Sequence, residues 1–203
     1  MRIGIYGGTF DPPHNGHISA CKTFLDNVEL DILYVIPVYT PPHKMQKSDT
    51  APLSRLEMSK IAFSSLSSKV FVSDIEIKRE GKSYTADTIR FFKENYMDAE
   101  IFFLCGTDMI LTMDFWYKPD YIFENATIVY VRRENDEEIT EEIAKKCAIY
   151  EEKFNAKIIY LKMDTIEISS TDIRSAINDE KRLKSLVSPQ IYNFILENGL
   201  YLD

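Results

Sequence analysis

Residues 1–17 read MRIGIYGGTFDPPHNGH, in which a short apolar strand, predicted at 2–6, leads into a glycine turn, a double proline and a helix start. Glycines let backbone N–H groups approach a ligand closely, and the positive end of a helix favours an anion such as phosphate at the same place. His14 and His17 are three positions apart, so both can donate hydrogen bonds to one polyphosphate from one side of the helix start. This stretch therefore predicts a phosphate site.

Two histidines at this spacing also raise the question of a metal site. A zinc ion needs three or four protein ligands, and beyond this pair the chain has only His43 and three widely spaced cysteines. A buried histidine pair with a merely structural role is a second alternative. All three histidines lie beside prolines or glycines in predicted strand-to-helix loops, where parallel sheets bind ligands. We therefore favour phosphate and expect no protein ligand to a metal.

Outward from this stretch, short apolar runs alternate with amphipathic segments of helix length, a pattern typical of a mostly parallel sheet. Strands are predicted at residues 2–6, 32–36, 69–75, 100–105, 127–131 and 157–161. Helices are predicted at residues 17–27, 52–63, 85–96 and 138–154. We expect an α/β fold with a Rossmann-like, doubly wound sheet of about six strands.

The end of the chain, residues 168–203, carries the signals of two short helices. One follows the Ser/Thr cap at residues 169–171, and the other has Ser188 as its N-cap. Arg174, one turn beyond the first cap, offers a fork of donors suited to phosphate oxygens. Because a chain of 203 residues usually forms one core, we expect these helices to complete a single domain over residues 1–203.

The composition excludes several classes of protein. Hydrophobic residues make up 45% of the chain and aromatic residues 12%, too many for a disordered protein. The net charge of −8, with acidic residues concentrated at 134–152, disfavours nucleic acid and anionic membranes as partners. No apolar run approaches the roughly 18 residues of a membrane helix, and no secretory signal precedes the first strand. Cys21, Cys105 and Cys147 are widely spaced, so we expect buried, reduced thiols and a cytoplasmic protein.

Two segments resemble the signatures of a known superfamily. Residues 8–17 (GTFDPPHNGH) resemble the GTFDPxHxGH signature of the nucleotidyltransferases related to class I aminoacyl-tRNA synthetases. Residues 168–174 (ISSTDIR) resemble the second signature of these enzymes, ISSTxIR. Nearly every specified position is filled, and the segments come in the expected order, so the resemblance implies a nucleotidyltransferase.

Further segments resemble the bacterial nicotinate-nucleotide adenylyltransferases within that superfamily. They are residues 37–44 (PVYTPPHK), 81–88 (GKSYTADT), 105–108 (CGTD) and Trp116. The resemblance covers essentially the whole chain and implies transfer of AMP from ATP to nicotinate mononucleotide, giving deamido-NAD and pyrophosphate in NAD biosynthesis. Two alternatives keep this chemistry with nicotinamide mononucleotide or a pantetheine phosphate as acceptor. A non-catalytic nucleotide-binding protein is a third alternative, from a different class.

The resemblance also implies roles for individual residues. Those implied to bind ATP are Gly8, Thr9, Phe10, His14, His17, Gly106, Asp108, Ser170, Thr171 and Arg174, with the last three on the β and γ phosphates. Those implied to bind the acceptor are Lys44, which neutralises its phosphate from a loop, Trp116, which stacks on the pyridine, and Thr85 and Tyr117, which recognise the carboxylate. The catalytic set is His14, His17, Lys44 and Arg174.

The implied reaction needs no general base, because the acceptor phosphate has a second pKa near 6 and is mostly dianionic at neutral pH. We expect Mg²⁺ to arrive with ATP and to need few protein ligands. The expected partners are therefore the two small-molecule substrates, and assembly into a homo-oligomer is left open.

Overall fold

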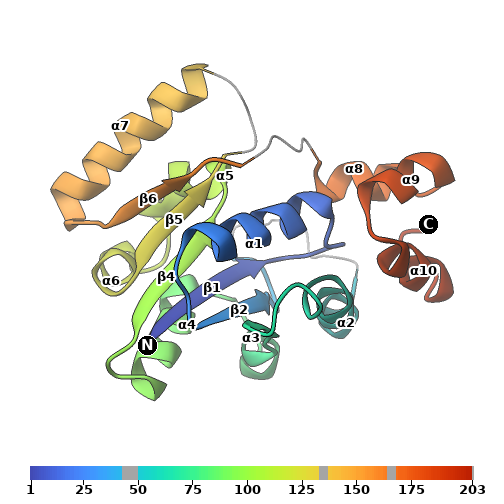
Figure 1. Cartoon of the computed structure of the whole chain (residues 1–203), viewed down its shortest axis with the longest axis horizontal. Helices are drawn as coiled ribbons and strands as arrows, with labels where there is room; N and C mark the ends of the chain where they lie inside the picture. The colour runs from blue at the N-terminus through green and yellow to red at the C-terminus, as the bar shows by residue number, and fades with distance from the viewer. Residues whose placement is uncertain (43–49, 133–136, 164–167, 203) are drawn as a thin grey trace.

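The computed structural model describes residues 1–42, 50–132, 137–163 and 168–202. Within these residues, six parallel strands form one sheet in the order β3-β2-β1-β4-β5-β6. The strands are β1 (Arg2–Gly8), β2 (Ile32–Pro37), β3 (Val70–Val72), β4 (Glu100–Cys105), β5 (Thr127–Val131) and β6 (Ile158–Leu161). This order confirms the predicted Rossmann-like sheet. β1 lies at its centre, between β2 and β4 (Figure 1).

The three central strands end close together at one edge of the sheet. Gly8 pairs with Pro37 at the end of β1 and β2, and Tyr6 pairs with Leu104 of β4. The segments that follow these strands therefore leave the sheet side by side. In an open α/β sheet, ligands bind at this edge, where the strand order reverses. The GTFDPPHNGH segment begins at the middle of it.

Helices cover both faces of the sheet (Figure 1). They are α1 (Asn15–Asn27), α2 (Pro52–Phe63), α3 (Ile75–Arg79), α4 (Thr85–Asn95), α5 (Thr107–Thr112), the 3-10 helix η1 (Met113–Phe115), α6 (Pro119–Asn125), α7 (Glu137–Phe154), α8 (Ser170–Ser175), α9 (Glu180–Leu186) and α10 (Pro189–Glu197). Side chains of α1, α2 and α8 to α10 share one hydrophobic cluster with the sheet. Those of α4 to α7 share the other.

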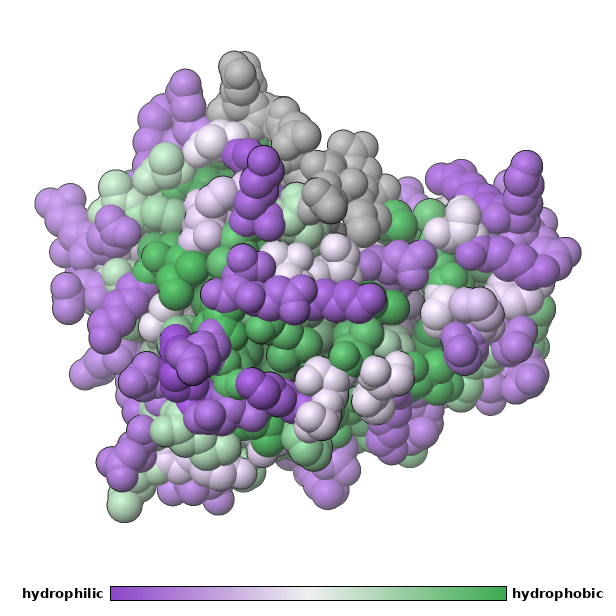
Figure 2. Space-filling view, viewed as in Figure 1, coloured by the Kyte–Doolittle hydropathy of each residue, from purple (hydrophilic) through white to green (hydrophobic). Residues whose placement is uncertain are grey.

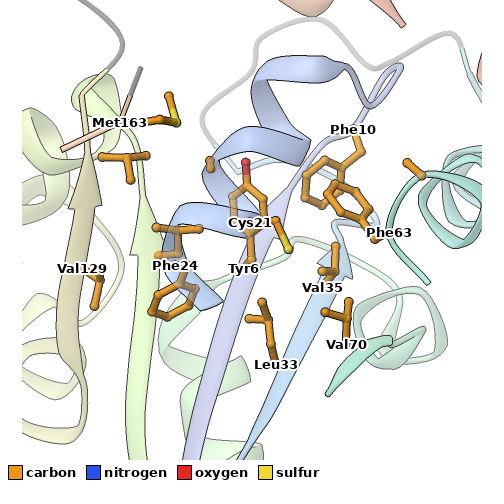
Figure 3. Close-up of a cluster of buried hydrophobic side chains, with 14 of the residues drawn as sticks. Tyr6, Phe10, Cys21, Phe24, Leu33, Val35, Phe63, Val70, Val129 and Met163 are labelled. Carbon is orange, nitrogen blue, oxygen red and sulfur yellow. The ribbon is translucent and has the colours of Figure 1, made fainter. Parts of the chain in front are cut away.

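The central strand supplies side chains to both clusters, because successive residues of a strand point to opposite faces. Ile3 and Ile5 are buried in the cluster that includes α4, whereas Tyr6 belongs to the cluster beneath α1. Figure 3 shows this second cluster, in which Phe10 from the loop after β1 faces Phe63 of α2. Their ring centroids are 5.3 Å apart. Phe10 therefore anchors the first motif in the core.

The structure departs from the sequence prediction in the shorter elements. The strand predicted at 69–75 is wrong at its end, because β3 stops at Val72 and α3 begins at Ile75. Ser73 N donates the last sheet-like hydrogen bond to Val35 O, and a helical turn follows. The helices α3, α5, η1, α6 and α9 were not predicted. They have three to seven residues, too few for a periodic pattern to stand out.

The surface agrees with the polar composition of the chain. Figure 2 shows hydrophilic residues around the rim of one face and hydrophobic residues nearer its middle. Among the helices in the described part of the chain, none has both the length and the apolar character needed to cross a membrane. Cys21 and Cys105 are buried free thiols, as expected, while Cys147 is only half-buried.

Candidate functional site

A cavity of about 330 Å³ opens at the carboxyl edge of the sheet. Its walls come from the segments that follow β1, β2 and β4, from the start of α4, and from the residues after η1. Predicted site residues that line it are Gly8, Thr9, Phe10, His17, Thr85, Gly106, Asp108, Trp116 and Tyr117. The fold thus gathers most of the predicted site, from four separate parts of the sequence, around one space.

The first motif brings its two histidines into direct contact. His14 precedes α1 as its N-cap residue and is 1% exposed, and its ring stacks on that of His17 with the centroids 3.6 Å apart. His14 N donates a hydrogen bond of 3.2 Å to His17 Nδ1. Because Nδ1 is an acceptor, a neutral His17 carries its proton on Nε2 and can donate from that atom. His17 lines the cavity, whereas His14 lies outside its lining.

The second motif forms α8 and docks against the first. Ser169 caps this helix, because its Oγ accepts from Asp172 N at 3.1 Å and its N–H donates to the Asp172 carboxylate. These hydrogen bonds to Ser169 hold the pKa of Asp172 below its ordinary range. Beyond the cap, Ser170 Oγ donates to Pro12 O at 3.0 Å, and Arg174 donates to Asp11 O at 2.7 Å.

The two motifs are therefore joined through the backbone between the glycine turn and α1. Arg174 also donates to Thr171 Oγ1 at 3.1 Å, so the three predicted phosphate ligands of this motif stand next to the 11–14 segment. They are not among the residues that line the cavity itself.

The opposite end of the cavity has an aromatic wall. Trp116 is half-buried, packs edge-on against Phe103 with centroids 6.3 Å apart, and donates from Nε1 to Thr112 Oγ1 at 3.4 Å. Tyr117 follows, with its ring 4.6 Å from that of Tyr84. Trp116 thus packs against the sheet on one side and lines the cavity on the other. Both contacts are expected of a ring that stacks on a ligand.

The segment that carries this wall is tied to α7. Asp114 of η1 accepts hydrogen bonds from Lys146 Nζ at 2.9 Å and from Tyr150 Oη at 3.0 Å. Burial acts to raise the pKa of Asp114, but the hydrogen bonds from these two partners and the Lys146 charge outweigh it and lower that pKa. The α7 helix therefore braces the aromatic wall from behind.

Two residues at or behind the cavity were missed in the sequence. Glu76 lines the cavity at 4% exposure, and one of its oxygens accepts from Thr88 Oγ1 at 2.6 Å. Burial raises the pKa of Glu76, although hydrogen bonds oppose the shift. Arg55 is 1% exposed, and its guanidinium donates four hydrogen bonds to backbone carbonyl groups. In the sequence, Arg55 lies at helical spacing from Met58 and Ala62, on the face of the helix that is buried. This spacing could have predicted that Arg55 is buried.

Lys44, predicted to bind the acceptor phosphate, and His43 lie outside the described residues. Gly106 is the extended N-cap residue of α5, and Asp108 lies in its first turn, so both reach the cavity from the end of β4. In the described ranges, no group of three or more His, Cys, Asp or Glu side chains is arranged to hold a metal ion.

Comparison with known proteins gives consistent matches. The model of the family described as cytidylyltransferase-like matches residues 5–176. A probable nicotinate-nucleotide adenylyltransferase of Clostridium tetani is 36% identical over 197 residues, 97% of both chains. One from Clostridium botulinum strain Eklund 17B is 37% identical over 202 residues, 100% of this chain and 98% of the relative.

Solved structures show the same fold. The nicotinic acid mononucleotide adenylyltransferase of Plasmodium falciparum, complexed with APC, superposes with a TM-score of 0.77 at 22% identity, covering 98% of this chain and 96% of that one. The same enzyme complexed with NaAD gives a TM-score of 0.75 at 21% identity, covering 98% and 97%. At this identity the likeness shows a shared fold.

Proposed function

This chain belongs to the cytidylyltransferase-like family and, within it, to the nicotinate-nucleotide adenylyltransferases, so we propose that it transfers AMP from ATP to nicotinate mononucleotide. The products are nicotinate adenine dinucleotide and pyrophosphate. The observation that carries the proposal is the docking of the second motif on the first, through Arg174 to Asp11 O at 2.7 Å, beside a cavity with an aromatic wall. The proposed site for the ATP phosphates is therefore next to a cavity that could hold the pyridine ring.

In this reaction an oxygen of the acceptor's 5′-phosphate attacks the α-phosphorus of ATP. The new oxygen–phosphorus bond forms as the bond from the α-phosphorus to the bridging oxygen breaks, and pyrophosphate leaves with that electron pair. The attacking phosphate is mostly dianionic at neutral pH, so no side chain has to remove a proton. The protein's task is therefore to align the two phosphates and to stabilise charge on the departing pyrophosphate.

We assign the ATP phosphates to the space between the two motifs. His17 can donate from Nε2 at the start of α1, where the helix dipole also favours negative charge. Arg174 has five N–H donors, so its contacts to Asp11 and Thr171 leave others for phosphate oxygens. Ser170 and Thr171 stand beside it, and His14 supports the ring of His17 by stacking. Lys44 remains a proposed phosphate ligand on the strength of the family motif.

The remaining assignments follow the lining of the cavity. We assign the nucleotide sugar to Gly106 and Asp108, beside the glycine turn of Gly8 to Phe10. The pyridine ring is assigned to Trp116, since stacked aromatic rings attract each other and the contacting face of each ring is removed from water. Its carboxylate is assigned to Thr85 and the backbone at Tyr117, which line the same end.

Nucleotidyltransferases use a divalent cation with ATP, and we propose Mg²⁺ here. The donor set fits an ion that is held by phosphate oxygens and water, because the described residues offer no cage of three carboxylate, imidazole or thiolate groups. When bound, the ion would neutralise phosphate charge. Free thiols at all three cysteines fit a reducing compartment, and we propose the cytoplasm.

A pyrophosphate-release assay tests this function. Purified protein with ATP and Mg²⁺ is given nicotinate mononucleotide, nicotinamide mononucleotide or 4′-phosphopantetheine in parallel. We expect the highest kcat/KM with nicotinate mononucleotide. A preference for either of the other acceptors would reassign the substrate, and no pyrophosphate with any of the three would favour a non-catalytic nucleotide-binding protein.

A further inference from the structure

Arg55 places a charged group in the core directly behind the cavity. It lies in the first turns of α2 and is 1% exposed. Its guanidinium donates to Thr9 O at 2.9 Å, to Val38 O at 2.6 Å and to Tyr39 O at 2.9 Å. A fourth donor, Nε, reaches Thr50 O at 3.3 Å. Four of the five N–H groups of this side chain are thus spent on carbonyl oxygens of three separate segments.

A contribution to stability alone does not explain why a charged arginine is buried at this position. In the described part of the chain, Arg55 forms no ion pair within 4.0 Å, and the nearest carboxylate that influences it is that of Asp11. Removing a charge from water is costly, and hydrophobic residues in such positions are often at least as stabilising. The planar fork of arginine, however, can fix several acceptors at defined angles, which no apolar side chain can do.

The segments that Arg55 joins are two walls of the cavity. Thr9 belongs to the first motif, and Val38 begins the opposite wall, which continues to Pro41 and Pro42. Both line the cavity, and Thr9 belongs to the motif against which the ATP phosphates are assigned. The guanidinium of Arg55 therefore ties these walls together, beyond the point where Val38 N donates the last backbone hydrogen bond between them, to Gly8 O at 3.0 Å.

The second wall is held from its other side as well. Tyr39 N donates to Ser83 Oγ at 2.9 Å, and Ser83 N donates to Thr40 O at 2.9 Å. Arg55 donates to the carbonyl groups of residues 38 and 39. Ser83 binds the amide of residue 39 and the carbonyl group of residue 40. Residues 38–40 are thus clamped between α2 and the segment before α4.

We propose that Arg55 is a positioning residue for adenylyl transfer, which holds the first motif and residues 38–42 at the separation that aligns the acceptor phosphate with the α-phosphorus. This role rests on the proposed function, and Arg55 itself touches no substrate. Lysine at this position would keep the charge, but its single ammonium group cannot reproduce the fork that reaches both walls.

The test compares Arg55→Lys and Arg55→Gln with Met58→Ala in the pyrophosphate-release assay. Met58 lies on the same helix and is 0% exposed, so its truncation perturbs the core without removing a hydrogen bond to either wall. We expect both Arg55 variants to lower kcat by roughly 10²-fold, because small misalignments of reacting groups cost about that much. KM for each substrate should change by less than about threefold, since ground-state binding is retained. Met58→Ala should lower Tm and keep kcat when assayed well below its own Tm.

The outcomes are distinct. If either folded Arg55 variant keeps kcat within about twofold of wild type, or if Met58→Ala loses kcat equally, Arg55 has no positioning role. A loss confined to KM would likewise overturn it, because that pattern indicates weakened binding rather than misalignment. Wild-type protein that releases no pyrophosphate with any acceptor would contradict the proposed function instead, and is measured first for that reason.

Discussion

His14 and His17, which stack on each other, lie in different surroundings and are expected to have different roles. The ring of His14 is buried behind His17, and its backbone N–H occupies Nδ1 of His17. That hydrogen bond fixes both the tautomer and the direction of the second ring. We therefore expect His17 to act on the phosphates as the donor and His14 to act mainly through it. The i, i+3 spacing predicted that the two side chains are close, but only the fold shows which one reaches the cavity.

Replacing His17 by alanine should reveal the donor. We expect His17→Ala to lower kcat by about 10²–10³-fold, because one preorganised donor to developing charge contributes that much. The circular dichroism spectrum should stay native, since the side chain lies at the rim of the cavity and α1 keeps its backbone hydrogen bonds to His14 O. Steady-state kinetics measure the effect. An unchanged kcat would exclude a catalytic role for His17.

Trp116 should affect only one of the two substrates. We expect Trp116→Ala to raise KM for nicotinate mononucleotide about 10-fold or more, since stacking of a base on an aromatic side chain contributes ~1–3 kcal/mol. KM for ATP should stay nearly constant, because the ATP phosphates are assigned to the two motifs and not to Trp116. Trp116→Phe is the matched control and should keep most of the affinity. Equal losses for both substrates would instead identify Trp116 as a core residue.

The η1 segment is too short to hold its own shape, so its position depends on α7. A three-residue 3-10 helix has few internal hydrogen bonds, and Asp114 compensates by accepting from Lys146 and Tyr150. Tyr150 Oη also contacts Ile110 O at 2.9 Å, which links α5 to the same point. The acidic helix α7 therefore braces the aromatic wall of the cavity.

This brace should be visible in the pH dependence of stability. The pKa of Asp114 in the folded protein lies below the ordinary 3.8 of an aspartate, because Lys146 and Tyr150 favour its charged form. Its contribution is therefore complete above about pH 4 and is lost as the pH falls through the lower folded-state value. We expect Asp114→Asn to reduce the free energy of unfolding by about 1–2 kcal/mol at pH 7.

Chemical denaturation at several pH values measures this difference. Between pH 7 and pH 5 the gap between wild type and Asp114→Asn should be constant, and below about pH 4 it should shrink. A gap that persists unchanged at pH 3 would show that the carboxylate charge contributes nothing. KM for the acceptor should rise in the same variant, since η1 leads directly into Trp116.

The long elements of this fold could be predicted because their signals are local. The strand at residues 100–105 and the helix at 52–63 were correctly bounded from apolar periodicity and flanking turns. The brace at Asp114 and the fork of Arg55 could not be predicted, because each depends on partners that only the tertiary fold brings near. A charged residue at helical spacing from the buried Met58 and Ala62 is the one local sign that Arg55 offered.

The first motif and the C-terminal segment of the chain meet at the carboxyl edge of the sheet. Asp11 follows the central strand, and Tyr201 stands near the C-terminus, yet Tyr201 Oη donates to Asp11 Oδ1 at 2.7 Å. Asn15 at the start of α1 similarly donates to Ser185 O at 3.2 Å in α9. The C-terminal helices, set to one side of the sheet (Figure 1), therefore close over the first motif. We therefore expect the order of the proposed phosphate site to depend on this last segment.

Tyr201→Phe should loosen this closure while leaving the sheet intact. The variant loses one hydrogen bond to a carboxylate that is nearly buried, so we expect the free energy of unfolding to fall by about 1–2 kcal/mol. Tyr160→Phe, which removes a hydroxyl from a ring 44% exposed on β6, is the control and should change it by less than about 0.5 kcal/mol. The amides of His17 and Ile18, which donate to His14 O, should exchange hydrogen faster in Tyr201→Phe alone, because local opening needs less free energy there. If these amides exchange at the wild-type rate, the C-terminal segment stabilises the domain without ordering the first motif.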